Sequence, residues 1–343
     1  MTSLSNVTRT VGLSRAASAP RWTIIIGAAF IFSLVGAFGI VRATNHGLGA
    51  VERLPAVTPV LSGATAQLEN TLLVGSDSRV GSDPTDGDHG SIGSESDAPG
   101  MRSDSMIVVR RDKETGALAL LSIPRDLLVK IGDTDDSKKI NSAYQFGPDV
   151  LVRTVERALN IPIHHYVEIG FPGFKRIVDA VGGVRICVDR PSRDTATGYF
   201  SGRGCKVLNG SKALGYARSR HFEQKKNGRW VLDGTGDVGR GVRQRAFMSA
   251  LARDAAAHLA RHPLDADEVL AAFAAAVRVD ERLDLVDLAR KWRRLGDVGT
   301  TSYSLPVNSD MVGGVFVFRL SNAAQPVIAF FAGLGPAPDP ATS

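Results

Sequence analysis

Three polar clusters, each pairing an acid with an arginine, adjoin apolar, strand-like runs of this sequence. They are SDSR at 76–79, RSD at 102–104 and PRD at 124–126. Rigid scaffolds commonly present functional side chains at the ends of strands. Asp77 and Asp104 are carboxylates that could hold one hard cation, because Mg2+ takes one or two protein carboxylates and leaves its other positions to water and phosphate oxygens. Spacing alone also permits a second interpretation, in which the two acids pair with Arg79 and Arg102 at a turn.

A second group of residues suits the binding of an anion. The run ALGYARSR ends in Arg218 and Arg220, whose guanidinium groups point the same way if the backbone is extended there. Arg240 and Gln244 are four positions apart and share one face of a predicted helix. Together with Arg125, these arginines exceed what the local acids can neutralise. Since arginine makes bidentate phosphate contacts, the set favours a phosphate site over a solvated surface strand.

The basic charge of the chain is concentrated in two places. The 343 residues carry a formal net charge of +6, and the acid-free tail at 1–21 supplies three arginines of it. Residues 213–245 contain eight lysines or arginines against three acids, which leaves the rest slightly negative. A local cationic pocket fits this distribution better than the long basic face that a nucleic-acid duplex needs. We therefore expect no nucleic-acid partner.

A membrane anchor is predicted near the amino terminus. The run at 22–41 has no charged residue over twenty positions, about the length that a helix needs to cross a bilayer. A cleaved signal peptide is the alternative, but its apolar region would be about 7 to 15 residues with a small-residue cleavage site. Arginines precede the run, so the positive-inside rule places the tail at 1–21 in the cytoplasm. We expect a single-pass protein of the cell membrane with its large domain outside.

Two cysteines, Cys187 and Cys205, fall in the part of the chain expected outside the membrane. A bridge between them would stabilise the fold by roughly 3 kcal/mol on the loop-entropy estimate. Two unrelated buried thiols are the alternative, but an even pair in an oxidising compartment favours a disulfide. The spacing fits neither a CxxC redox site nor a zinc site.

The order of elements along the chain predicts the α/β class. Residues 42–68 are rich in small residues and prolines and indicate a stalk, while Gly, Ser and Asp dominate an expected exposed loop at 80–100. The catalytic domain is expected at 69–335, followed by a disordered tail at 336–343. Apolar runs predict strands at 71–75, 106–109, 117–123, 164–171, 184–189 and 315–320. Helical spacing and stop signals predict helices at 148–160, 173–183, 238–260 and 284–295.

Seven motifs in a fixed order resemble those of the LytR-CpsA-Psr family of bacterial cell-wall phosphotransferases. They are LLVGSDSR, RSDSMIVV, LSIPRDLLV, KINSAYQFG, HHYVEIGFPGFKRIVDAVGGV, LNGSKALGYARSR and GDVGRGVRQR, and the match runs from about residue 71 to 320. The resemblance implies an α-β-α sandwich around a central mixed sheet, with a long apolar pocket for a prenyl chain. It also implies that a glycopolymer, with its linking phosphate, moves from a polyprenyl-pyrophosphate carrier to the muramic-acid hydroxyl of peptidoglycan.

The resemblance also assigns roles to individual residues. Asp77 and Asp104 would be the ligands of Mg2+ (or Mn2+), and with Arg125 they would form the catalytic set. The residues that would grip the pyrophosphate are Arg79, Arg125, Arg218, Arg220, Arg240 and Gln244. Pyrophosphate chemistry is mostly positioning and charge stabilisation, so a metal and several arginines are the main apparatus that it requires.

The general base and the exact function stay open at this point. Asp126 is a candidate base, but an acid there is as easily a buried partner of an arginine. His164 and His165 are expected to belong to a strand, and His221 has no motif around it. A hydrolase that passes the same lipid pyrophosphate to water is one alternative function, and a membrane-bound regulator of transcription is another. The alanine- and arginine-heavy composition favours arabinogalactan over teichoic acid as the polymer.

Overall fold

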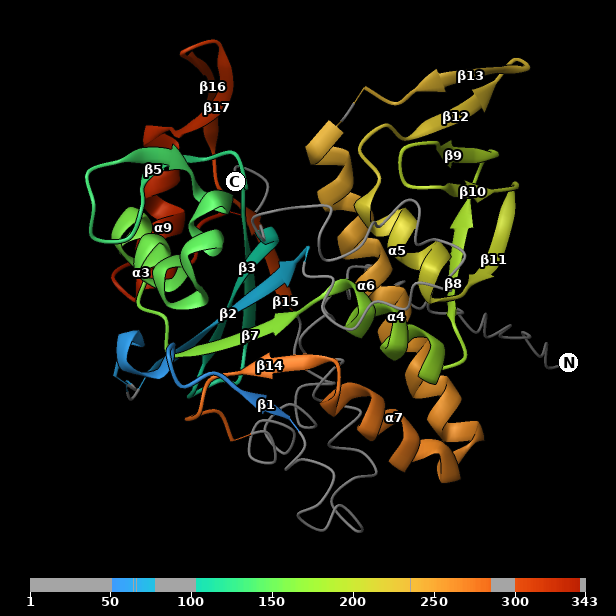
Figure 1. Cartoon of the computed structure of the whole chain (residues 1–343), viewed down its shortest axis with the longest axis horizontal. Coiled ribbons are helices and arrows are strands. Elements are labelled where there is room, and N and C mark those ends of the chain that lie inside the picture. Colours follow the sequence, from blue (N-terminus) through green and yellow to red (C-terminus); the bar gives the residue numbers. More distant parts are fainter. Residues whose placement is uncertain are drawn as a thin grey trace, which may run out of the picture.

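The computed structural model describes residues 51–63, 65, 67–77, 103–234, 236–284 and 300–339 (Figure 1). Within these residues, the centre of the molecule is a seven-stranded sheet in the order β1-β14-β7-β2-β3-β4-β15. Its strands are β1 (Glu52–Arg53), β2 (Leu68–Ser76), β3 (Ser103–Asp112), β4 (Leu118–Ile123), β7 (His165–Ile169), β14 (Val277–Val279) and β15 (Thr300–Ser304). β2 is antiparallel to β3 but parallel to β7, so the sheet is mixed, as expected.

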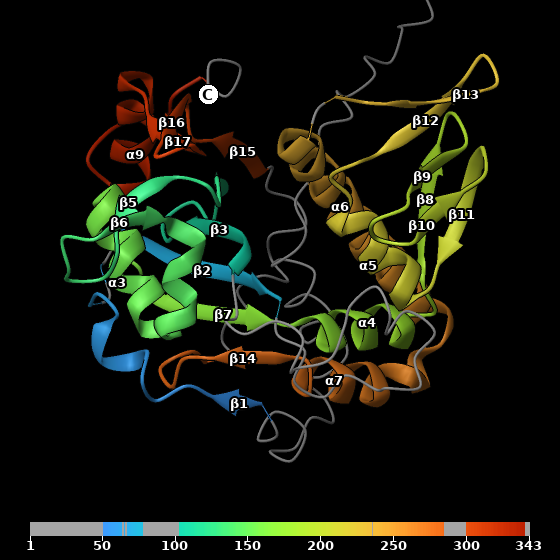
Figure 2. The ribbon, with the colours of Figure 1, turned by 45° about the horizontal axis from the view of Figure 1, so that its top comes forward.

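Helices cover both faces of this sheet, because strand residues alternate between two apolar cores. Val108 of β3 packs in the core that includes α3 (Pro148–Leu159) and α9 (Gln325–Ala332). Its neighbour Val109 packs in the opposite core, with α4 (Phe171–Ala180), α5 (Gly210–Arg218), α6 (Gly236–Arg261) and α7 (Ala266–Ala274). The result is a helix-sheet-helix arrangement, in which α3 and α9 lie on one side and α4 to α7 on the other (Figure 2).

The predicted helix at 148–160 is confirmed as α3, and its local signals explain it. Pro148 opens the helix, and Asp149 in its first turn accepts a hydrogen bond from Arg153 at 2.7 Å. Leu151, Val155 and other apolar residues at helical spacing are buried. Asn160 ends the helix in the left-handed conformation (φ 51°). The predicted helix at 173–183 is likewise confirmed as α4.

A smaller sheet lies beyond α5. In the part of the chain that the structure describes, it has four strands in the order β10-β9-β12-β13. These are β9 (Ser192–Asp194), β10 (Tyr199–Ser201), β12 (Glu223–Lys226) and β13 (Arg229–Leu232). Tyr199 packs on Tyr216 of α5, with ring centroids 5.2 Å apart. This small sheet is therefore joined to the helical layer that covers one face of the central sheet.

The expected disulfide is present. Cys187 on β8 (Val184–Val188) is bonded to Cys205 on β11 (Gly204–Leu208). The two cysteines are direct cross-strand partners in the β8-β11 ladder. The bond therefore links two neighbouring strands at the edge of the helical layer.

The prediction of a stalk at 42–68 is wrong for residues 51–61. Glu52 and Arg53 pair with β14, and the Arg53 guanidinium donates to the carbonyl oxygens of Asp280 and Leu283 at 2.8 and 2.7 Å. The apolar residues of this segment recur every three or four positions and are buried: Val51, Leu54, Val57 and Leu61. The prolines of the segment had suggested a linker, but these apolar side chains pack it onto the domain. The folded domain therefore begins earlier than residue 69.

Several other predictions concern residues outside the described part of the chain. They are the tail at 1–21, the span at 22–41, the rest of the stalk at 42–50, the loop at 80–100 and nearly all of the helix at 284–295. Among the helices that the structure describes, none combines the length and apolar character needed to cross a membrane.

Candidate active site

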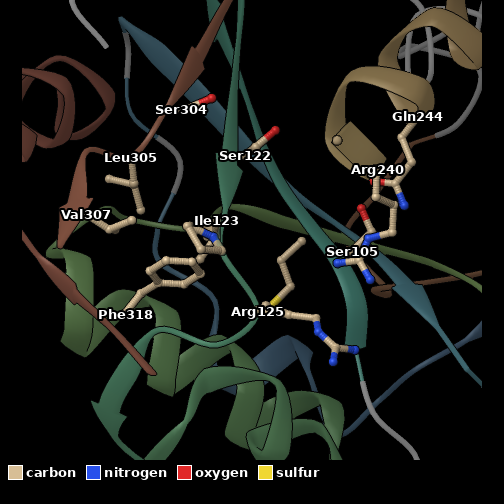
Figure 3. A pocket seen from close by; sticks show the side chains of 13 residues that line it. Ser105, Ser122, Ile123, Arg125, Arg240, Gln244, Ser304, Leu305, Val307 and Phe318 are labelled. Atoms are coloured by element: carbon tan, nitrogen blue, oxygen red, sulfur yellow. The ribbon is translucent and has the colours of Figure 1, made fainter. Parts of the chain in front are cut away.

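A cavity of about 380 Å³ lies between the ends of β3 and β4, the β15 end of the sheet and helix α6 (Figure 3). This is the size range of ligand-binding pockets. Arg125, Arg240 and Gln244 line it. Three of the residues predicted to grip pyrophosphate are thus brought to one cavity from two segments more than a hundred positions apart.

The opposite wall of the cavity is apolar. Leu305, Val307 and Phe318 lie across from Arg240 and Gln244 in Figure 3. Val307 and Phe318 come from the hairpin of β16 (Val307–Val312) and β17 (Val315–Leu320). The cavity therefore has one cationic side and one apolar side, and this combination suits an amphiphilic ligand.

Arg125 is held where β4 ends, in a loop that is tied to the apolar wall. The Phe318 amide donates to the Asp126 carbonyl oxygen at 2.9 Å, and the Asn141 amide donates to the Arg125 carbonyl oxygen at 3.2 Å. The Asp126 carboxylate pairs with Lys139 at 3.0 Å and with Arg125 at 3.8 Å. Of the two interpretations of Asp126, the structure supports the ion-pair partner.

Arg218 and Arg220 do not lie on an extended run, so that expectation is wrong. The run ALGYAR belongs to α5, and the Asn209 side chain caps this helix by accepting a hydrogen bond from the Lys212 amide at 3.1 Å. Arg218 is the last residue of α5, and its guanidinium lies 4.3 Å from the centre of the Phe171 ring. The two arginines therefore flank a helix end instead of alternating along a strand.

The turn between the two arginines is fixed by Asp194, which is buried on β9. Its carboxylate accepts hydrogen bonds from the Ser219 hydroxyl at 2.7 Å and from the Arg220 and His221 amides at 3.0 and 2.9 Å. Burial acts to raise the pKa of Asp194, but these hydrogen bonds outweigh it and hold that pKa below its ordinary value. A buried carboxylate thus sets the backbone that carries Arg220.

Helix α6 is tied to the same turn. Arg243 donates to the Ser219 carbonyl oxygen at 2.7 Å and to the Asp233 carboxylate at 2.9 Å. Gln244 donates to the Ala217 carbonyl oxygen at 3.2 Å. These bonds place Arg240 and Gln244 on α6 beside the end of α5, although Arg218 and Arg220 are not among the cavity-lining residues. Sequence reasoning missed Arg243, whose i+3 spacing from Arg240 was the available signal.

The two candidate metal ligands are brought to one end of the sheet by the β2-β3 pairing. Gly75 pairs with Ser105 and Ser76 pairs with Ser103, so Asp104 is the extra residue of a register shift. Asp77 follows Ser76 directly, and Ser105 lines the cavity. Two carboxylate-bearing positions at the same end of neighbouring strands match the donor set that Mg2+ prefers. The Asp104 side chain, Arg79 and Arg102 lie outside what the structure describes.

A buried acid beside this end of the sheet was missed from the sequence. Glu168 on β7 accepts hydrogen bonds from Ser76 at 3.2 Å, Tyr166 at 2.9 Å and Arg278 at 3.2 Å, and also from the Tyr144 hydroxyl. Burial, and next the Glu168 charge, raises the pKa of Tyr144 far above its usual range, so its hydroxyl remains a donor. The network braces the residue that precedes Asp77. An acid inside the apolar run HYVEI was the available signal.

The histidines contribute to the fold. His165 pairs with Thr71 near the start of β2, at the other end of the strand from Asp77. His164 is buried, and burial lowers its pKa. His221 donates its backbone amide to Asp194 while its side chain is exposed. The expectation that these histidines belong to a strand is confirmed for His165, which opens β7, whereas His164 lies just before the strand.

Known proteins resemble this chain in sequence and in fold. A Corynebacterium glutamicum protein, "Probable cell wall biosynthesis protein LcpB", is 40% identical over 195 residues, which is 57% of this chain and 44% of that protein. TagV of Bacillus subtilis, named a polyisoprenyl-teichoic acid–peptidoglycan teichoic acid transferase, is 34% identical over 223 residues, 61% of this chain and 54% of that protein. The chain thus spans about half the length of these relatives.

Solved structures share the fold. A LytR-Csp2A-Psr enzyme from Actinomyces oris is 23% identical with a TM-score of 0.59, and the match covers 82% of this chain and 96% of that one. The crystal structure of B. subtilis TagV is 26% identical with a TM-score of 0.55, covering 80% of this chain and 100% of that one. The LytR_cpsA_psr family model matches residues 46–328, and this chain therefore belongs to that family.

Proposed function

We propose that this protein is a phosphotransferase that moves a glycopolymer from a polyprenyl-pyrophosphate carrier to the muramic-acid hydroxyl of peptidoglycan. The observation that carries the proposal is the cavity with one cationic and one apolar side. A prenyl diphosphate has the same two-part character, since its chain suits the Phe318 side and its phosphates suit Arg125 and Arg240. The relatives named as teichoic acid transferases support the same reaction class. The polymer would be of the arabinogalactan or teichoic-acid type.

The arginines would hold the diphosphate from two directions. Arg125 approaches from the end of β4 and Arg240 from α6. Arg218 and Arg220 flank the end of α5 that Arg243 and Gln244 join to α6. Fixed guanidinium groups stabilise charge as it develops on a leaving phosphate, at no reorganisation cost during the reaction. We assign the pyrophosphate grip to Arg125, Arg218, Arg220, Arg240 and Gln244, together with Arg79.

Asp77 and Asp104 are the residues that would hold Mg2+ or Mn2+, which would neutralise phosphate charge when bound. In the transfer, the acceptor hydroxyl oxygen bonds to the phosphorus that carries the polymer, and the hydroxyl loses its proton to a base. The bond from that phosphorus to the bridging oxygen breaks, and polyprenyl phosphate leaves with its charge held by the arginines.

The proposal includes a place for the protein in the cell. The apolar run at 22–41 would anchor it in the cell membrane, with residues 1–21 in the cytoplasm and the catalytic domain outside. A disulfide between Cys187 and Cys205 suits an oxidising exterior. The test is a fusion of the carboxyl terminus to a reporter enzyme that is active only outside the cytoplasm. The proposed topology predicts that this fusion is active. A cytoplasmic signal would instead favour the regulator of transcription.

The test of the reaction uses the purified full chain and a lipid-linked donor, with and without peptidoglycan oligomers. Transfer predicts polymer covalently joined to the oligomers, and chelation of divalent cations should stop it until Mg2+ is restored. Polymer phosphate released at the same rate with and without oligomers, and never joined to them, would identify a hydrolase and end the transferase proposal.

A further inference from the structure

The small sheet has two faces of opposite character. Tyr199, Asp194 and Ser192 point inward and are buried. On the other face, cross-strand pairing aligns Phe200 with Arg193, Arg193 with Glu223 and Glu223 with Leu232. Lys225 and Trp230 are paired two positions further along and therefore share this outer face. We call the outward set Arg193, Phe200, Glu223, Lys225, Trp230 and Leu232 the platform.

The platform is ordered by its own contacts. The Arg193 guanidinium lies 4.4 Å from the centre of the Trp230 ring and donates to the Glu223 carboxylate at 2.6 Å. The Phe200 and Trp230 rings meet edge to face with centroids 6.3 Å apart. Phe200 is nevertheless 61% exposed. An exposed aromatic group with prearranged polar partners typically marks a binding surface.

The chemistry of the platform suits a carbohydrate. Aromatic ring faces pack against the C–H faces of sugars, and a planar arginine-carboxylate pair can bond to neighbouring hydroxyl and amide groups. On the platform itself, two cations, Arg193 and Lys225, outnumber the single acid Glu223. The excess of positive charge favours a glycan that carries carboxylates over a neutral one.

The platform is linked to the predicted phosphate-binding arginines through β9 and β12. Its strand β9 carries Asp194 on the inward face, and Asp194 fixes the turn that bears Arg220. Arg220 lies three residues before β12, which carries Glu223 and Lys225. A polymer bound on the outer face therefore lies against the strands that position the phosphate-binding arginines.

The position of the small sheet in the molecule bears on how an acceptor would approach. In an in-line transfer the attacking oxygen approaches the phosphorus from the side opposite the leaving group. The leaving prenyl phosphate is proposed to lie in the cavity beside α6. β12 and β13 lie at the opposite end of the molecule from β1, in both views (Figure 1, Figure 2). Among the described strands, β1 is the one nearest in sequence to the apolar run predicted to be the anchor.

We propose that the platform is the docking surface for the acceptor, the peptidoglycan glycan strand, a polymer of N-acetylated sugars with carboxylate-bearing peptides. The inference rests on the proposed function for the identity of the acceptor. It adds a site for that acceptor, built by Phe200, Trp230 and the Arg193-Glu223 pair and separate from the diphosphate grip.

The test measures binding of the full chain, in detergent micelles and without any lipid donor, to soluble peptidoglycan oligomers. Trp230→Ala removes the larger of the two ring faces and should raise Kd about tenfold, and Phe200→Ala should raise it about threefold. Trp230→Phe should retain most of the affinity because it keeps a ring face. The matched control is Phe146→Ala, a 53% exposed ring with Lys138 5.5 Å from its centre, in a segment packed on the other face of the central sheet.

Several results would overturn the proposal. They are a wild-type chain that does not bind the oligomers, a Trp230→Ala variant that binds as tightly as wild type, and a Phe146→Ala control that loses as much affinity. Should Trp230→Ala lower the melting temperature, Phe200→Ala and Lys225→Ala carry the test. Because no donor is present, a chain that binds oligomers but never transfers polymer would refute the proposed function and leave the platform standing.

Discussion

The two walls of the cavity are built by different kinds of interaction. The apolar wall is attached through backbone hydrogen bonds and packing, as where the Phe318 amide meets the Asp126 carbonyl oxygen. The cationic wall depends on buried charged side chains, since Asp194 and Arg243 both bond to the turn at Ser219. Packing tolerates substitutions of similar volume, whereas a buried charge that loses its partner is costly. We therefore expect the cationic wall to be the more fragile one.

The largest effect is expected when a cation of the cavity is removed. Arg240→Ala should lower kcat about 10²- to 10³-fold, the usual cost of one preorganised charge-stabilising group. Steady-state transfer assays with saturating donor measure it. Arg253→Ala is the control, because Arg253 is an exposed residue further along the same helix. If the two variants are equally active, Arg240 does not contact the diphosphate.

The next effect probes the network behind the cationic wall. Asp194→Asn removes the charge of a carboxylate that accepts hydrogen bonds from the Ser219 hydroxyl and from three backbone amides. Hydrogen bonds to a charged group contribute about 1.5–3 kcal/mol each, so we expect a loss of unfolding free energy of a few kcal/mol. Transfer should fall about tenfold as Arg220 loses its fixed position. Urea unfolding and transfer assays measure the two changes. If neither value changes, the cationic wall does not depend on the buried charge of Asp194 and is not the more fragile wall.

Local signals explain what was predictable from the sequence. Pro148, the apolar spacing of α3 and the ending at Asn160 are all within one helix, and the prediction there is confirmed. The disulfide was also predictable, because the prediction needed only an even number of cysteines and an expected oxidising compartment. The family motifs supplied Arg125, Arg240 and Gln244, which the structure brings to one cavity.

The errors and omissions come from contacts between distant segments. Asp194 meets the Ser219 turn 25 positions away, and Glu168 meets Ser76 across 92 positions. Nothing local to either acid announces such a partner. The segment at 51–61 was assigned to a stalk because its prolines are a local signal, whereas its pairing with β14 is not. The prediction of an extended backbone at Arg218 and Arg220 was wrong because Asn209 caps a helix that continues to Arg218.

A smaller effect is expected from the apolar wall. Phe318→Ala removes a ring that lines the cavity, and a buried Phe side chain is worth about 1.5–3 kcal/mol. We expect KM for a donor with a full-length prenyl chain to rise about tenfold with little change in kcat, because the contact is equal in the ground and transition states. A donor with a short chain should show no difference between wild type and variant. A fall in kcat with unchanged KM would instead place Phe318 near the reacting phosphorus.

The smallest effect is a difference in pH dependence between wild type and Asp194→Asn. The folded state holds the pKa of Asp194 below its ordinary value, so the stability that this group contributes is present above the unfolded pKa of about 3.9 and is lost as pH falls through the folded pKa. Wild type should therefore lose more unfolding free energy than Asp194→Asn between about pH 5 and pH 3. Urea midpoints across this range measure the difference. Parallel pH profiles would mean that the pKa of Asp194 is the same in the folded and unfolded states, and its hydrogen bonds would then not stabilise its charged form.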